Sequence, residues 1–180
     1  MSKKVLIISS SLRGGSNSEI LAHAAEKGAK DAGNEVEFIS LKGKEIKFCL
    51  GCLACQKTHK CVQKDDMADL ICKVQKADAL VFATPIYYYE LCGQLKTFLD
   101  RCNPLFSQEN NFKEVYLITT SYDDAPHASN RAISGLEGWI ECFEQSHLAG
   151  TLIGGGVDAP KEAANHEDLL QQAYELGKNI

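Results

Sequence analysis

The amino-acid sequence predicts a doubly wound α/β fold with a five-stranded parallel sheet in the strand order 2-1-3-4-5. Short apolar runs alternate with amphipathic helical patterns along the chain, which is typical of a parallel sheet covered on both faces. The first apolar run, at residues 5–8, is continuous, as in strands that are buried on both sides. Right-handed crossovers between successive strands then favour the doubly wound order.

The predicted strands are short apolar or alternating segments, and they lie at residues 5–8, 36–40, 79–83, 115–119 and 148–153. The predicted helices carry apolar residues at helical spacing, and they lie at residues 20–32, 65–75, 91–101, 127–145 and 162–177. Between them, residues 43–64 form a long irregular connection that is rich in cysteine. The sequence has no internal repeat, low-complexity tract or linker, so we expect a single domain over residues 1–180.

Composition limits the class of protein. The 180 residues suffice for one domain with a full core, and the formal net charge of −5 argues against a nucleic-acid partner. No apolar stretch approaches the roughly 18 residues of a membrane span, and the N-terminus has no secretory apolar region. We therefore expect a cytoplasmic protein with no membrane partner, in which the 8 cysteines are reduced and favour metal or redox roles over disulfides.

Residues 9–18, which read Ser-Ser-Ser-Leu-Arg-Gly-Gly-Ser-Asn-Ser, link the first predicted strand to the first predicted helix. Such a turn directs backbone N–H groups and the positive end of a helix at one spot, which suits an anion. Its further candidate phosphate donors are Ser10, Ser11, Arg13, Ser16, Asn17 and Ser18. The sequence lacks the glycine motifs of triphosphate and dinucleotide sites, so a phosphate monoester such as that of FMN fits better. The alternative is an ordinary turn in which Ser16 only caps the helix.

Two further loops, at residues 84–89 and 120–126, follow predicted strands and should reach the same carboxyl edge of the sheet. In doubly wound sheets, ligands bind outside that edge, at the switch point between strands one and three. Pro85 sets the chain direction beyond its strand, and Tyr87 and Tyr88 offer flat faces to a planar heterocycle. The alternative is that the tyrosines only form a surface cluster.

Four cysteines, Cys49, Cys52, Cys55 and Cys61, have the spacing C-x2-C-x2-C-x5-C. This compact spacing lets one loop wrap four thiolates around an iron–sulfur cluster, although a zinc site or a loop of packed thiols without metal is also compatible with it. The remaining cysteines are expected to be small buried hydrophobes on helices: Cys72, Cys92, Cys102 and Cys142.

The motifs that point to a family are Ser10-Ser11-Leu12-Arg13 with Ser16-Asn17-Ser18, Pro85-Ile86-Tyr87 with Gly93, Leu95-Lys96 and Asp100-Arg101, and Gly150-Thr151 with Gly154-Gly155-Gly156. Over almost its whole length the chain resembles the NADPH-dependent FMN reductases of the flavodoxin-like class. This resemblance implies a three-layer flavodoxin-like fold, bound FMN, NAD(P)H as co-substrate, and a homodimer with its active sites near the interface. It also implies that Ile86, Thr120 and Ser121 contact the flavin.

The cysteine loop resembles that of iron-sulfur flavoproteins, which share this fold and carry a [4Fe-4S] cluster beside FMN. Plain reductases of the same group have a similar segment without metal, here Gly51-Cys52 with Cys55 and Cys61-Val62. A cluster, zinc and no metal therefore all remain open for this loop.

The leading functional interpretation is an FMN-dependent oxidoreductase that takes a hydride from NAD(P)H and reduces a quinone, flavin or nitro compound. Because the flavin carries the chemistry, we name no catalytic residue. Lys96, Asp100 and Arg101 should orient their helix and loop. Trp139 and residues 87–89 are candidates for a dimer surface, and a core position is the equal alternative for Trp139. The alternative is an electron carrier that holds FMN and a cluster and docks protein partners. The sequence identifies neither the acceptor nor a residue that selects NADH or NADPH.

Overall fold

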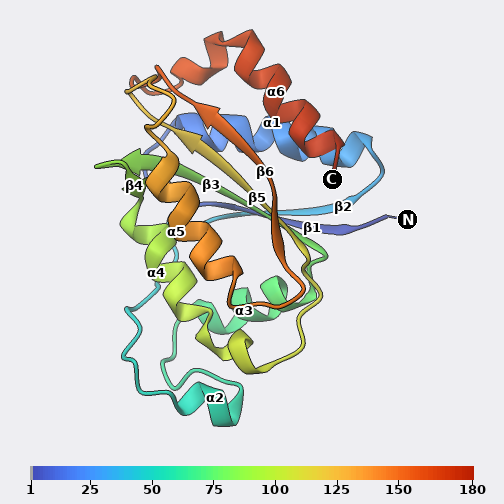
Figure 1. The fold of residues 1–180 in the computed structure, drawn as a ribbon, viewed down its shortest axis with the longest axis vertical. Coiled ribbons are helices and arrows are strands. Elements are labelled where there is room, and N and C mark those ends of the chain that lie inside the picture. Colours follow the sequence, from blue (N-terminus) through green and yellow to red (C-terminus); the bar gives the residue numbers. More distant parts are fainter. Residues whose placement is uncertain (1) are drawn as a thin grey trace.

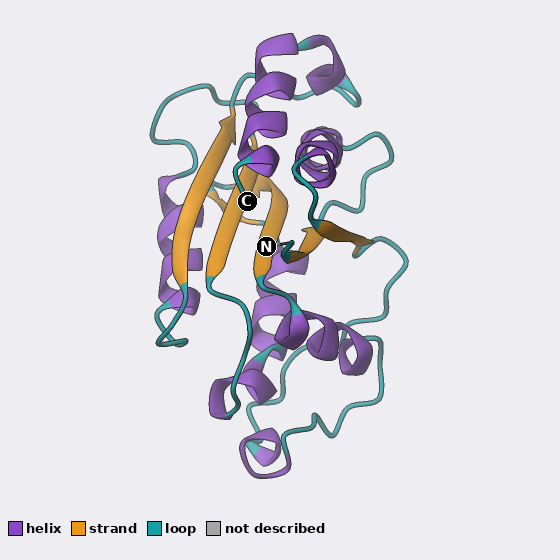
Figure 2. Ribbon diagram, turned by 90° about the vertical axis from the view of Figure 1, so that its right-hand side faces the viewer, coloured by secondary structure: helices purple, strands orange, loops and turns teal. Residues whose placement is uncertain are grey.

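The computed structural model describes residues 2–180 and contains a parallel sheet with helices on both faces, as Figure 2 shows. The parallel strands are β1 (Lys4–Ser9), β2 (Glu35–Ser40), β3 (Ala79–Tyr87), β5 (Glu114–Thr120) and β6 (His147–Gly154). They are ordered β2-β1-β3-β5-β6, which confirms the predicted order 2-1-3-4-5 among the main strands. A short strand, β4 (Glu90–Leu91), pairs antiparallel with β3.

Helices α1 (Asn17–Asp31) and α6 (Glu167–Lys178) lie on one face of the sheet (Figure 1). Helices α3 (Met67–Lys76), α4 (Gly93–Arg101) and α5 (Asn130–Ile140) lie on the other. Three shorter helices lie in the connections: α2 (Ala54–Thr58), η1 (Asn103–Ser107) and η2 (Glu162–Asn165). The cysteine-rich connection with α2 extends to the end of the molecule opposite α6 (Figure 1).

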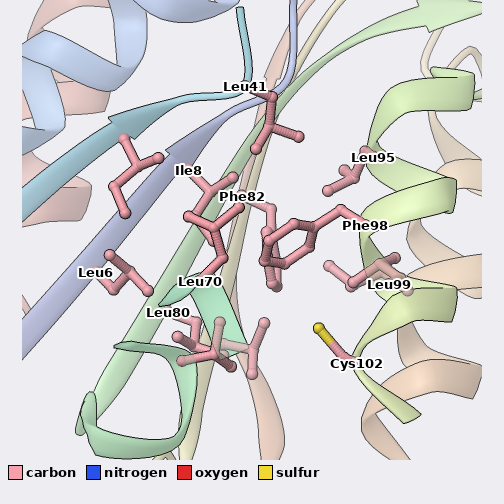
Figure 3. Packing of buried hydrophobic residues seen from close by; sticks show 14 of the residues in the cluster. Leu6, Ile8, Leu41, Leu70, Leu80, Phe82, Leu95, Phe98, Leu99 and Cys102 are labelled. Atoms are coloured by element: carbon pink, nitrogen blue, oxygen red, sulfur yellow. The ribbon is translucent and has the colours of Figure 1, made fainter. Parts of the chain in front are cut away.

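Each central strand contributes to two apolar cores because its side chains alternate between the two faces. In β1, Leu6 and Ile8 face the α3, α4 and α5 side, whereas Val5 and Ile7 face the α1 and α6 side. Figure 3 shows the first of these cores, in which Phe98 and Leu95 of α4 point toward Phe82 of β3.

For Trp139 the sequence left a dimer surface and the core as alternatives, and the structure packs this partly buried side chain against the first core. Its ring stacks on Phe112 with centroids 5.9 Å apart and meets Phe82 edge-on. The prediction for the cysteines on helices is half right: Cys92 and Cys102 are buried, but Cys72 and Cys142 are exposed. Their spacing alone did not distinguish the inner from the outer helix faces.

The sequence predicted a loop at residues 84–89, but the structure forms a hairpin there. Strand β3 continues through Pro85 to Tyr87 and turns at Tyr88 and Tyr89 into β4. Both turn residues have positive φ, 52° and 63°, which is uncommon for a bulky side chain. Because Leu91 pairs with Ile86 in this hairpin, α4 begins at Gly93 rather than at residue 91.

The other helix bounds also differ from prediction at particular points. The helix predicted at residues 127–145 is confined to Asn130–Ile140. The helix predicted at 162–177 is divided at His166 into η2 and α6. The N–H of Ala163 donates to the side chain of Asn17, and this hydrogen bond fastens η2 to the start of α1.

No helix within residues 2–180 has the length and apolar character that crossing a lipid bilayer requires.

Helices α1 and α6 approach so closely that only glycine fits at their contact. A Cβ atom on Gly28 would lie 2.0 Å from the carbonyl oxygen of Tyr174, and one on Gly177 would lie 1.9 Å from that of Ala25. We expect Gly28→Ala to lower the free energy of unfolding by about 1–3 kcal/mol, because the overlap outweighs the roughly 1 kcal/mol gain in helix propensity. Urea denaturation would measure this change.

The matched control is Gly138→Ala in α5, where the added Cβ would meet no atom of residues 2–180 within 4 Å, apart from its chain neighbours and the backbone of its own helix. We expect that variant to gain up to about 1 kcal/mol. A similar gain in Gly28→Ala would contradict the close packing of α1 on α6.

Candidate functional site

A pocket of about 150 Å³ lies where β1, β3 and β5 end at the same edge of the sheet. Its walls come from the turn before α1, the end of β3, the segment after β5 and the segment after β6. The lining residues are Ser11, Arg13, Ser16, Asn17, Pro85, Ile86, Tyr87, Thr120, Ser121, Tyr122, Val157 and Asp158. Nine of the twelve residues predicted to bind the cofactor are therefore gathered here, as the parallel topology requires.

The turn before α1 presents mostly hydroxyl groups and one cation to this pocket. Ser16 is the N-cap of α1, and its side chain accepts a long hydrogen bond of 3.5 Å from the N–H of Glu19. The Ser11 hydroxyl accepts from the N–H of Arg13 at 3.4 Å, while the Arg13 side chain is exposed. A capping role for Ser16 and an anion-binding role for the turn are therefore compatible.

Within the part of the chain that the structure describes, three predicted contacts lie outside this pocket: Ser10, Ser18 and Tyr88. The Ser10 hydroxyl is fully buried and donates to the carbonyl of Ala83 at 2.9 Å. The Ser18 hydroxyl is also buried and lies 3.0 Å from that of Ser16. Tyr88 is 98% exposed at the tip of the hairpin. The two serines thus stabilise the turn through buried contacts on the side away from the pocket.

Three lining residues were missing from the sequence prediction: Tyr122, Val157 and Asp158. Tyr122 directly follows Ser121, and the glycine run at 154–156 brings the chain out at the same edge. Since every parallel strand ends at this edge, the residues that follow β6 could have been included on topology alone. Asn17 is held in two directions, because its amide donates to the carbonyl of Ala159 and accepts from the N–H of Ala163.

The hairpin after β3 is tied to the segment after β5. The Tyr89 hydroxyl donates to the Asp123 carboxylate at 3.0 Å, and the Tyr89 ring stacks on His127. A hydrogen bond from the N–H of Ala125 and this one from Tyr89 lower the pKa of Asp123. The strained turn at residues 88–89 is therefore held by a specific polar contact.

The cysteine-rich connection has a neck in which residues 45–48 run beside residues 63–66. The N–H of Glu45 donates to the Asp66 carboxylate at 2.7 Å, and the N–H of Lys47 donates to the Asp65 carboxylate at 2.9 Å. The side-chain amide of Gln63 donates to the carbonyl of Phe48 at 2.8 Å. The four cysteines Cys49, Cys52, Cys55 and Cys61 lie beyond this neck.

All four of these cysteines line one small pocket, together with Leu50, Leu53, Val62, Gln63 and Asn103. Cys55 is buried, Cys61 is partly buried, and the other two are exposed. Burial raises the pKa of the Cys55 thiol, and the nearby thiols of Cys61 and Cys49 add to this effect. Among residues 2–180, no three His, Cys, Asp or Glu side chains converge as they would around a single metal ion.

Two sulfurs of this pocket accept N–H hydrogen bonds from the end of α4 and the start of η1. Arg101 Nη2 lies 3.4 Å from Cys61 Sγ, and Asn103 Nδ2 lies 3.4 Å from Cys55 Sγ. Such donors are typical around the sulfur ligands of iron–sulfur clusters, so the donor set fits a cluster.

Arg101 also forms a buried ion pair with Asp65 in the neck. Its Nη1 and Nη2 donate to the two carboxylate oxygens at 2.5 and 2.9 Å, and the two side chains are 1% and 0% exposed. Burial by itself would raise the pKa of Asp65, but the hydrogen bonds and charge of Arg101 outweigh it and lower that pKa. In contrast, Lys96 and Asp100 form an exposed pair along the outer face of α4.

The strand order and the polar turn at the carboxyl edge define a flavodoxin-like protein. A solved structure, the NAD(P)H:quinone oxidoreductase from Methanothermobacter marburgensis, has a TM-score of 0.74 with 16% identity, over 99% of this chain and 97% of that chain. This likeness shows the fold. Residues 3–139 match the family described as NADPH-dependent FMN reductase, and the chain belongs to this family of flavin-binding oxidoreductases.

Two of the relatives that are named iron-sulfur flavoproteins match most of this chain. One, from Methanocaldococcus jannaschii, is 30% identical over 186 residues, which cover 98% of this chain and 95% of the relative. The other, from Methanosarcina thermophila, is 36% identical over 154 residues, which cover 82% of this chain and 81% of the relative.

We expect Asp65→Asn to lower the free energy of unfolding at pH 7 by about 3–5 kcal/mol, because Arg101 would remain buried without a counter-charge. The wild-type pair should lose its contribution in acid. Its folded pKa is lowered, so the stabilisation is complete above the unfolded value of about 3.9 and declines as the pH falls below it. Denaturant titrations at several pH values would measure both effects.

Asp100→Asn, which breaks the exposed pair with Lys96, serves as the control and should cost at most about 1 kcal/mol. A difference between wild type and Asp65→Asn that stays constant from pH 6 to pH 3 would contradict the role assigned to the Asp65 carboxylate.

Proposed function

We propose that this chain is an iron–sulfur flavoprotein that carries electrons, with FMN at the carboxyl edge of the sheet and a [4Fe-4S] cluster on Cys49, Cys52, Cys55 and Cys61. The observation that carries the proposal is that four thiols with cluster-type spacing line a single pocket. The N–H donors of Arg101 and Asn103 on two of the sulfurs support it. The relatives of that name support it further.

The pocket at the carboxyl edge supports a specific placement of FMN. Its volume of about 150 Å³ is smaller than the roughly 300 Å³ or more of sites that enclose a whole ligand, so it suits the phosphate and the polar tail. The phosphate would lie at Ser11, Arg13 and Ser16, at the positive end of α1. The flavin ring would lie in the open, against the exposed faces of Tyr87 and Tyr122, which are 53% and 80% exposed.

The bound groups supply the redox chemistry: FMN exchanges electrons in pairs or singly, and an iron–sulfur cluster exchanges them singly. The residues of this chain bind and orient them. Arg13 and the α1 N-terminus neutralise the phosphate, and the Tyr89–Asp123 bond holds the hairpin beside the ring site. Apolar side chains around the cysteine pocket are exposed, including Phe48, at 79%, and Leu50, at 69%. These side chains support docking of a protein electron partner there.

A second candidate is an NAD(P)H-dependent reductase that binds FMN without a cluster and reduces a quinone, flavin or nitro compound. The match of residues 3–139 to the NADPH-dependent FMN reductases favours it. In this case the thiols would only pack the loop. For both candidates we propose a homodimer, with the exposed Tyr87 and Tyr88 as part of its surface.

Metal analysis of anaerobically purified protein separates the two candidates. We expect about four iron and four acid-labile sulfide per chain, and broad absorbance near 400 nm beyond that of the flavin. Cys61→Ala should lose most of the iron but keep FMN, whereas Cys142→Ala, which changes an exposed cysteine outside the pocket, should keep both. A yellow, iron-free protein that oxidises NADPH would contradict the cluster and support the reductase.

The FMN site is tested by flavin fluorescence quenching on the apoprotein. We expect the double variant Arg13→Ala/Ser16→Ala to bind FMN at least about tenfold more weakly, because each hydrogen bond to a charged group is worth about 1.5–3 kcal/mol. The control is Lys27→Ala/Ser134→Ala, which removes one cation and one hydroxyl outside the pocket. Unchanged FMN affinity in the first variant would contradict the phosphate assignment.

A further inference from the structure

We propose that Arg101 is a positioning residue for the cluster, which holds a hydrogen bond on the Cys61 sulfur and thereby raises the reduction potential of the cluster. This inference rests on the proposed function, because it requires a cluster on the four cysteines. The observation behind it is the 3.4 Å contact between the buried guanidinium and Cys61 Sγ.

The geometry leaves the guanidinium little freedom. Arg101 is 1% exposed, and its Nη1 donates to the carbonyl of Lys47 at 2.7 Å and to the Asp65 carboxylate. Its Nη2 donates to the other Asp65 oxygen at 2.9 Å and to Cys61 Sγ. The acceptors lie on both arms of the neck and on the cysteine segment, so Arg101 joins three parts of the connection that were separate in the sequence.

Arg101 is therefore aimed at the sulfur by contacts that do not depend on the sulfur. Its Nε is buried and has no hydrogen-bond partner among residues 2–180. The bidentate pair with Asp65 determines the plane of the guanidinium. A lysine could supply the charge at this position but could not reproduce this planar fork.

The electrostatic consequence has a definite sign. One-electron reduction of a cluster adds negative charge that is shared with its thiolate sulfurs, so an N–H donor on a sulfur stabilises the reduced form more than the oxidised form. Asp65 partly offsets the charge of Arg101, but the guanidinium is the group that meets the sulfur, while the carboxylate accepts from the guanidinium. Loss of this donor should therefore lower the potential.

Asn103 provides an internal comparison. Its side-chain amide donates to Cys55 Sγ at the same distance of 3.4 Å, but the donor is neutral. Hydrogen bonds from charged donors are about twice as strong as neutral ones, so Asn103→Leu should shift the potential in the same direction by less. If Arg101 had only a structural role, its loss would not be expected to shift the potential more than the loss of Asn103.

The test is a redox titration of the anaerobically purified full chain, in which dithionite supplies the electrons and the cluster is followed by electron paramagnetic resonance. The variants are Arg101→Lys, Arg101→Gln, and Arg101→Gln/Asp65→Asn, the last of which leaves no unpaired buried charge. We expect the ratio of reduced to oxidised cluster, at the wild-type midpoint, to fall about tenfold in the double variant. For a one-electron couple this fall equals 59 mV. In Arg101→Lys this ratio should fall by less.

The control is Lys96→Gln, which removes a cation from the exposed face of the same helix, and it should leave the cluster potential unchanged. The FMN potential, read from visible absorbance, should also stay the same in every variant. Cluster-loaded Arg101 variants with the wild-type potential would overturn this inference and leave the proposed function intact. Loss of the cluster from all three variants would also overturn it, since Arg101 would then act on assembly alone. A wild-type protein without iron would overturn both.

Discussion

The structure depends on one topological constraint: parallel strands that leave the sheet at a single edge, with the order reversing between β1 and β3. This arrangement places the turn before α1, the β3–β4 hairpin and the segment after β5 around one pocket, although more than a hundred residues separate the first from the last. The apolar cores on both faces hold the strands in this order. The polar side chains at the edge are consequently positioned by packing that lies well behind them.

Helix α4 connects this edge to the cysteine pocket. At its start, the N–H of Cys92 donates to the Thr84 hydroxyl, and Cys92 Sγ lies 3.2 Å from the Ser10 hydroxyl behind the phosphate turn. At its end, Arg101 meets Cys61 and Asp65. Nine helical residues rise about 13 Å, so the two proposed redox sites lie at opposite ends of one rigid element.

A buried ion pair at the neck is a costly way to anchor a loop, because both charges lose their hydration. An apolar contact could not replace this ion pair, because the guanidinium of Arg101 donates to a carboxylate, a backbone carbonyl and a sulfur at the same time. We infer that the ion pair specifies one arrangement of the cysteine-rich connection. The exposed apolar side chains around the pocket could not hold that arrangement by burial.

The sequence predicted the strand order, because the apolar runs are strong and the crossover rule leaves few alternatives. It also predicted most of the first pocket, since residues that follow parallel strands must meet. It did not predict that Ser10 and Ser18 point inward, because a hydroxyl run carries no sign of which members face the ligand. The hairpin at Tyr88 and Tyr89 was also missed, because neither residue is typical of a turn with positive φ. The Arg101–Asp65 contact joins residues 36 positions apart, and only the fold brings them together.

A crystal structure of the anaerobically purified protein, with an anomalous difference map at the iron edge, would test the two-cofactor assignment most directly. We expect four iron positions among the sulfurs of Cys49, Cys52, Cys55 and Cys61, and an FMN phosphate at the N-terminus of α1. An iron-free pocket, or a flavin bound away from the carboxyl edge of the sheet, would contradict it.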